Sequence, residues 1–277
     1  MGAVVYFLFV NAGVTSLLMP PSPIGVNAGF SLARGDEALF YNPANFEVGS
    51  EYQVQCYYNQ YFLSMNGVSF SVSRRIGRLN LGLGFVNFDY GDIEWHPPYP
   101  TEDSLTTYSA NDFSMFLGCA VRFSRLGRVG VNLKYISENI YIYSDYGLAL
   151  DLTFAYNNAR SGVSFGISNF GTRLLINNDR VNLPARISLG GYYKFKDYLG
   201  GVDVFYLVNN GKFEFNTTLG ASFYKIIELY LGINYREEFY PGFGFSIRSD
   251  YLKIKYGGSF FPMGLGMVNT IGIGFSF

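Results

Sequence analysis

The stretch EYQVQCYYN, residues 51–59, alternates polar and apolar side chains with a period of two residues. Its apolar positions are Tyr52, Val54, Cys56 and Tyr58, and two glutamines stand between them. Successive side chains of a β-strand point to opposite faces. The alternation therefore predicts a strand with one apolar face and one polar face.

The same alternation continues to the C-terminus, in segments that are separated by Gly, Asn, Asp or charged turns. In GVSFSVSRR, residues 67–75, the apolar positions alternate with serines, and NTIGIGFSF, residues 269–277, ends the chain in the same pattern. Segments of about ten alternating residues are typical of membrane-spanning β-barrels, and we count about 14 of them. The sequence predicts an all-β fold, a transmembrane antiparallel β-barrel of about 14 strands over residues 49–277.

The composition agrees with a chain whose outer surface lies in lipid. Charged residues make up 15% of the sequence, against roughly 25% in soluble domains, and aromatic residues reach 19%. The net charge of −1 provides no basic field, so nucleic acid is excluded as a partner. The longest apolar run, residues 4–10, is much shorter than the roughly 20 residues of a membrane-spanning helix.

The polar face of the predicted strands suits a lumen, because it consists mainly of Gly, Ser, Thr, Asn and Ala. Its scattered charges are of both signs, and we expect internal ion pairs and filling rather than a selective pore. These candidate lumen charges are Arg122, Lys134, Asp151, Arg186, Asp203, Glu214, Glu228, Arg236, Arg248, Lys253 and Lys255.

The N-terminal region differs from the rest of the chain. Residues 1–12 carry a short apolar core and a small residue where a signal peptide would be cleaved, although the usual positive start is absent; the alternative is a buried N-terminal strand. Further on, GDEALFYNPANF, residues 35–46, does not alternate. Asn42 is expected to cap a short helical turn, with Pro43 at its first position.

Two stretches predict longer connections between strands. Residues 91–110 contain the only Trp, the only His and three of the ten prolines, and residues 171–184 form the second stretch. Proline does not fit inside a sheet, and barrels of this class carry their longer loops on the extracellular side. Such loops serve as lids or binding surfaces, or as ordered coverings.

The motifs that would indicate an enzyme lack their context. GVSFG, residues 162–166, matches a nucleophile elbow, but Ser164 lies within an alternating strand and His96 precedes it. One His and two cysteines do not make a metal cluster, and Cys56 and Cys119 fall in apolar phases, as small buried or lipid-facing residues do. We predict no enzyme activity, no metal and no cofactor.

The chain ends on Phe277, the last apolar position of an alternating segment. A terminal aromatic residue resembles the signature by which bacterial outer-membrane barrels are recognised for assembly. The alternative is an ordinary last strand that ends in Phe. Together with the low charge, this ending favours the bacterial outer membrane, with outer-membrane lipid and the barrel assembly machinery as partners.

Several segments resemble the PorV/PorQ family within the FadL-like superfamily of outer-membrane barrels. They are IGVNAGFSLARGDEALFYNPANF at residues 24–46, NLKYISENIYIYSDYGLALDLTFAY at 132–156, GVSFGISNFGTRL at 162–174 and LPARISLGGYYKF at 183–195. The resemblance covers nearly the whole chain. The chain is shorter than a typical PorV and lacks the larger loop insertions of FadL.

The resemblance implies a fourteen-stranded barrel in which residues 13–48 enter the lumen as a hatch, with Asn42, Pro43 and Ala44 as the hatch motif. PorV-like members assist type IX protein secretion, and FadL-like members pass hydrophobic solutes. We therefore expect a secretion-accessory or protein-binding barrel, whose partners are secretion-system proteins. The alternatives are a passive channel for hydrophobic small molecules and a sealed structural barrel.

Overall fold

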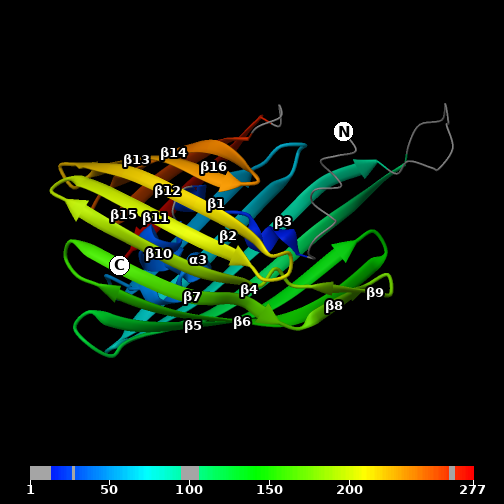
Figure 1. Ribbon diagram of the computed structural model, residues 1–277, viewed down its shortest axis with the longest axis horizontal. Helices are drawn as coiled ribbons and strands as arrows, with labels where there is room; N and C mark the ends of the chain where they lie inside the picture. The colour runs from blue at the N-terminus through cyan, green and yellow to red at the C-terminus, as the bar shows by residue number, and fades with distance from the viewer. Residues whose placement is uncertain (1–13, 27–28, 95–105, 262–265) are drawn as a thin grey trace.

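The computed structural model describes residues 14–26, 29–94, 106–261 and 266–277. Fourteen strands form one closed antiparallel barrel, and two short strands form a separate hairpin (Figure 1). The predicted fold class and strand number are confirmed. The signal-peptide stretch at residues 1–12 and His96 lie outside the described residues.

The strands differ in length around the barrel, and β3 to β6 are the longest. Their bounds are β1 (Tyr52–Gln60), β2 (Asn66–Ile76), β3 (Leu79–Glu94), β4 (Thr107–Arg122), β5 (Gly127–Ile140), β6 (Tyr143–Asn157), β7 (Ser161–Gly171), β8 (Arg173–Ile176), β9 (Asp179–Asn182), β10 (Arg186–Phe195), β11 (Tyr198–Leu207), β12 (Lys212–Phe223), β13 (Ile227–Arg236), β14 (Glu238–Arg248), β15 (Leu252–Phe261) and β16 (Gly266–Ser276).

Each barrel strand pairs with its neighbour in sequence, except that β7 pairs with β10 past the β8–β9 hairpin. Pairing of β1 with β16 closes the barrel, with Cys56 opposite Ile273. Closure leaves no free sheet edge, which is what a spanning sheet requires in lipid. In Figure 1 the hairpin lies at the right-hand end, and the C-terminus lies toward the left-hand end.

The two faces of the barrel wall follow the alternation in the sequence. Leu117 and Leu133 point outward, with 57% and 48% of their surfaces exposed, whereas Asn132 and Thr153 point inward and are fully buried. Cys56 and Cys119 lie in the outward phase of their strands and are free thiols. The apolar phase therefore forms the outer surface of the barrel and the polar phase faces the lumen.

Residues 14–26 and 29–48, here called the N-terminal segment, run inside the barrel. They form the short helices η1 (Thr15–Leu18), η2 (Pro23–Val26), α2 (Gly29–Leu32), η3 (Gly35–Glu37), α3 (Ala38–Tyr41) and η4 (Pro43–Asn45). Helix η4 contacts β4, β5 and β6, α2 contacts β7, β10 and β11, and η2 contacts β14, β15 and β16. No helix in the described residues is long and apolar enough to cross a membrane.

The hydrophobic core lies between the N-terminal segment and the inner wall of the barrel. Leu39 and Phe46 are completely buried there, together with Phe116 and Tyr57 of the wall. Asn42 caps η4 as predicted: its Oδ1 accepts from the Ala44 N–H at 3.2 Å, and Pro43 stands at the first helical position. The motif is thus a capped turn that is buried inside the barrel.

The two predicted connections are partly wrong at their bounds. Residues 91–94 and 107–110 belong to strands β3 and β4, so the first connection is shorter than expected. A bulge between Asp89 and Asp92, with Gly91 at φ +73°, lets β3 continue past the glycine that resembled a loop start. In the second stretch, Asn177 and Asn178 both adopt positive φ, and this turn folds residues 173–182 into the β8–β9 hairpin.

Candidate functional site

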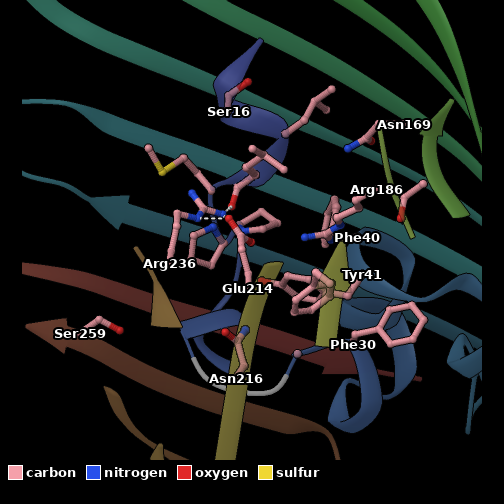
Figure 2. A pocket seen from close by; sticks show the side chains of 18 of the residues that line it. Ser16, Phe30, Phe40, Tyr41, Asn169, Arg186, Glu214, Asn216, Arg236 and Ser259 are labelled. Atoms are coloured by element: carbon pink, nitrogen blue, oxygen red, sulfur yellow. Dashed lines mark hydrogen bonds and ion pairs between the residues drawn. The ribbon is translucent and has the colours of Figure 1, made fainter. Parts of the chain in front are cut away.

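A cavity of about 500 Å³ lies inside the barrel (Figure 2). Phe62, Glu237 and Phe261 in its lining place it toward the end that carries the longer connections. The N-terminal segment supplies one side of its lining, from residues 16–21, 29–30 and 40–41. The inner faces of the strands supply the other side. The volume lies within the range of small-molecule sites, which are concave and mostly apolar.

Aromatic rings form much of the lining. Phe40 of the N-terminal segment meets Phe116 of β4 edge to face, with centroids 5.4 Å apart, and Phe30 meets Phe205 of β11 in the same way at 6.2 Å. Tyr41 also lines the cavity, and its hydroxyl donates to the carbonyl of Ser22. Aromatic side chains present large apolar surfaces, so such a lining suits an apolar or aromatic ligand.

A first ion pair lines the cavity between β5 and β6. Lys134 Nζ lies 2.7 Å from Asp151 Oδ2, and each side chain is only 4% exposed. Asn169 completes the pair, because its Oδ1 accepts from Lys134 Nζ at 2.6 Å and its N–H donates to Asp151 Oδ1 at 2.8 Å. Each charge is satisfied by fixed partners, so this part of the wall carries no free charge.

A second ion pair joins Glu214 of β12 to Arg236 of β13. Arg236 Nη2 donates to Glu214 Oε2 at 3.2 Å, and Figure 2 shows the two side chains facing each other. Arg186 of β10 belongs to neither pair; its guanidinium lies over the Phe205 ring, 4.7 Å from the centroid, and its Nε has no hydrogen-bond partner. Within the described part of the chain, the cavity thus combines an aromatic lining with one cation, Arg186, that forms no ion pair.

Other predicted lumen charges hold the N-terminal segment in place instead of lining the cavity. Asp203 accepts from the N–H groups of Phe30 and Ser31, at 2.9 and 3.0 Å. Lys255 pairs with Glu37, and the two side chains are 8% and 4% exposed. These contacts fix the segment between β11 and β15.

The last four of the predicted charges lie away from both groups. Glu228 is 3.7 Å from Lys253. Arg122 pairs with Glu47 at 2.5 Å, and Arg248 is exposed at the end of β14. The sequence did not indicate Glu37 or Glu47 as partners, because both precede the alternating region in which the lumen charges were sought.

Burial changes the acid chemistry of the N-terminal segment. It raises the pKa of Asp36 to about 7, although the Ser73 hydroxyl that donates to this carboxyl and the nearby Lys255 oppose the change. It also raises the pKa of Tyr41 well above its usual value, and the neighbouring Glu37 adds to this effect. Asp36 is therefore the group of this segment that titrates near neutral pH.

The remaining predicted residues can be placed. Ser164 lies within β7, as expected, and Phe277 is 67% exposed directly after β16, where its N–H donates to the carbonyl of Tyr52. Within the part of the chain that the structure describes, no three His, Cys, Asp or Glu side chains gather as metal ligands do.

Comparison with known proteins finds similar folds among solved structures only. The sequence matches no model of a protein family and no curated protein. The toluene transporter TodX of P. putida is similar in structure, with a TM-score of 0.69, 11% identity and coverage of 94% of this chain and 99% of that chain. The monoaromatic hydrocarbon channel CymD has a TM-score of 0.63, 11% identity and coverage of 96% and 97%. These structures show the fold, a 14-strand barrel, and they do not show the PorV/PorQ assignment.

Proposed function

We propose that this chain is a passive channel for small hydrophobic solutes, aromatic ones included, in a bacterial outer membrane. The observation that carries the proposal is the aromatic cavity of about 500 Å³ between the N-terminal segment and the barrel wall. The likeness to a toluene transporter and a monoaromatic hydrocarbon channel supports it, because both share the fold over nearly their whole length. The proposal favours the channel over the secretion-accessory function that the sequence first indicated.

In this proposal the N-terminal segment acts as a hatch. It occupies the lumen with buried residues such as Leu39 and Phe46, so a solute passes only through spaces beside it or after it moves. Asn42, Pro43 and Ala44 hold the turn that fits against β5 and β6. Deletion of residues 35–46 should therefore raise the conductance of the reconstituted barrel, and unchanged conductance would mean that the motif is only a turn.

The test of the channel is uptake of radiolabelled toluene or a labelled fatty acid by liposomes that contain the purified protein. The variant Ser114→Trp fills the cavity, because Ser114 is a buried lining residue of β4. Leu117→Trp is the matched control, since it adds the same ring to the outer face of the same strand. We expect flux above empty liposomes for the wild type and the control, and strongly reduced flux for Ser114→Trp. Flux no greater than that of empty liposomes would reject the channel.

A location in the outer membrane would give the barrel two kinds of partner. Outer-membrane lipid would cover the exposed apolar phase of the strands, and the barrel assembly machinery would recognise the terminal Phe277. Replacement of Phe277 by Asp should then reduce the amount of folded barrel in the outer membrane. A role in secretion stays a prediction, and an unchanged secreted proteome after deletion of the gene would count against it.

A further inference from the structure

A second cavity, of about 400 Å³, lies at the opposite end of the barrel, where short turns join the strands. Its lining comes from the β2–β3 turn, the β4–β5 turn and the end of the N-terminal segment. The two turns are neighbours, because β3 pairs with β4 with Leu79 opposite Val121. The arginines of this lining, here called the arginine mouth, are Arg75, Arg78, Arg122, Arg125 and Arg128.

The arginine mouth carries a large excess of positive charge. Glu47 is the one carboxylate in the lining, so five guanidinium groups leave four positive charges in excess. Glu47 accepts from Arg122 Nη2 through Oε1 and lies against Arg128 Nη2 through Oε2, both at 2.5 Å. One carboxylate thus serves two of the five arginines.

Among the described residues, no carboxylate pairs with the other three arginines of the mouth, Arg75, Arg78 and Arg125. The Arg75 side chain donates through Nε to the carbonyl of Gly77 at 3.2 Å. By contrast Arg74, which lies outside this cavity, pairs with Glu51 at 3.4 Å and stacks over the Tyr52 ring. These three guanidinium groups are exposed and line the same cavity, so their donors are available to an anion that the chain does not itself supply.

The residue type defines the chemistry of that anion. All the cations of the mouth are arginines, whose planar forks donate two parallel hydrogen bonds to phosphate or carboxylate oxygens. Inorganic phosphate offers four oxygens and up to two negative charges, and the diester of a phospholipid headgroup offers two unesterified oxygens and one negative charge. Either one can accept from the guanidinium forks that Glu47 leaves without a carboxylate.

We propose that the arginine mouth is a binding site for a phosphate group, which competes with Glu47 for Arg122 and Arg128. The phosphate is either a free anion or part of a phospholipid headgroup. A headgroup is within reach because Phe123 and Ile76 of the same turns are 66% and 52% exposed, at the edge of the apolar outer face. The site is separate from the aromatic cavity and does not depend on solute transport.

Occupancy of the site would act on the N-terminal segment. Glu47 belongs to this segment, and the N–H of the next residue, Val48, donates to Asn80 Oδ1 at 3.1 Å. A phosphate that binds Arg122 and Arg128 breaks both ion pairs of Glu47. The hydrogen bond from Val48 to Asn80 then still joins the end of the segment to the barrel wall. Phosphate should thus increase hydrogen exchange of the amides near Glu47.

The test is binding of inorganic phosphate, and separately of short-chain phosphatidylglycerol, to the full-length barrel in a zwitterionic detergent, measured by ³¹P NMR titration. Arg78→Gln/Arg125→Gln removes two unpaired arginines of the mouth, and Glu47→Gln removes the competing carboxylate. Arg160→Gln/Lys225→Gln is the matched control, since both residues lie on exposed turns at the same end and outside the cavity. Heat-modifiable gel migration confirms that each variant is folded.

We expect the double arginine variant to bind at least about tenfold more weakly than wild type. Glu47→Gln should bind more tightly, and the control pair should stay within about twofold of wild type. Binding of inorganic phosphate as tight as that of the lipid, or tighter, identifies the free anion as the ligand, and tighter binding of the lipid identifies the headgroup. Absence of binding at millimolar phosphate and lipid, or an equal loss in the control pair, would overturn the proposal.

Discussion

The N-terminal segment meets two walls of the lumen in different ways. On β3 to β5 it packs against glycines. A Cβ on Gly130 would overlap the backbone nitrogen of Ala44, and a Cβ on Gly118 would overlap Leu39. On this wall the segment lies directly on the strands, because the glycines place no side chain between them. Its ion pairs with this wall, from Glu47 to Arg122 and Arg128, lie at the partly exposed end of the segment.

On the opposite wall, β11 and β15 hold the segment through charge. Lys255 pairs with Glu37, which also accepts from the Ser22 hydroxyl at 2.5 Å and from the N–H of Ile24 at 3.2 Å. Asp203 accepts from the first N–H groups of α2. Buried charges depend on their partners, since an isolated one costs several kcal/mol.

The difference teaches where the segment can be released. Close backbone packing has one geometry and responds only to a change in shape, whereas a charge pair responds to loss of a partner or to a proton. If the segment is the hatch of a channel, its docking can be tuned at its ion pairs, which are buried on the wall of β11 and β15 and partly exposed at Glu47. Four predictions test this difference, and each is measured as the conductance of single barrels in planar bilayers and as hydrogen exchange of residues 30–46.

The largest effect is expected from Lys255→Met, which leaves Glu37 buried without its cation. Loss of one partner of a buried pair typically costs about 3–5 kcal/mol, so the segment should undock and conductance should rise. The double variant Glu37→Gln/Lys255→Met removes both charges and should recover most of the docking. If the double variant conducted as much as Lys255→Met, the pair would act through packing and not through charge.

The second prediction concerns the glycine wall. Gly130→Ala places a methyl group where the backbone of Ala44 lies, and overpacking of this kind typically costs about 1–3 kcal/mol. Gly200→Ala is the matched control, because the nearest atom to its added Cβ is Leu219 Cδ2 at 3.9 Å. Raised conductance in Gly130→Ala alone is expected, and equal behaviour of the two variants would show that the segment does not rely on this contact.

The third prediction uses the acid Asp36. Its pKa is about 7 when buried, against 3.8 as the ordinary value, so the docked segment retains a proton that the released segment loses. Docking is therefore strongest at low pH and weakens as the pH rises through 7. Between pH 6 and 8 the loss is about 1.4 kcal/mol. Conductance should rise over this range, and Asp36→Asn should abolish the rise; a rise that persists in Asp36→Asn would assign the titration to another group.

The sequence was sufficient to predict the strands of the barrel but not the contacts inside its lumen. Alternation depends only on the neighbours of each residue, so Val54 and Cys56 could be placed on the outer face from their own segment. The connection predicted at residues 91–110 was too long at both ends, because its prolines indicated a loop, whereas a bulge carries β3 past Gly91 to Glu94. The local pattern thus predicts which face of a strand points outward, and how many strands there are, better than the residues at which the strands end.

The partners inside the lumen could not be predicted in the same way. Glu37 and Lys255 are 218 positions apart, and they meet only because the path of the N-terminal segment and the register of β15 bring them together. The aromatic cavity has the same origin, since Phe40 and Phe116 come from opposite sides of it. The arginine mouth was missed because Arg78 and Arg125 lie in turns, outside the polar phase of any strand.

The smallest effect is expected at Asn42, whose side chain joins two parts of the N-terminal segment. Its Oδ1 accepts from the Ala44 N–H, and its Nδ2 donates to the carbonyl of Phe30 at 3.0 Å.

Asn42→Ala removes the cap of η4 and the stronger donor to the Phe30 carbonyl. We expect this change to destabilise the docked segment by about 1 kcal/mol. Asn45→Ala is the comparison, because Asn45 reaches the same carbonyl only at 3.4 Å. Faster exchange of the Ala44 amide in Asn42→Ala than in Asn45→Ala is expected, with a small change in conductance. If Asn42→Ala opened the barrel as widely as Lys255→Met, the capped turn and not the charged wall would control docking.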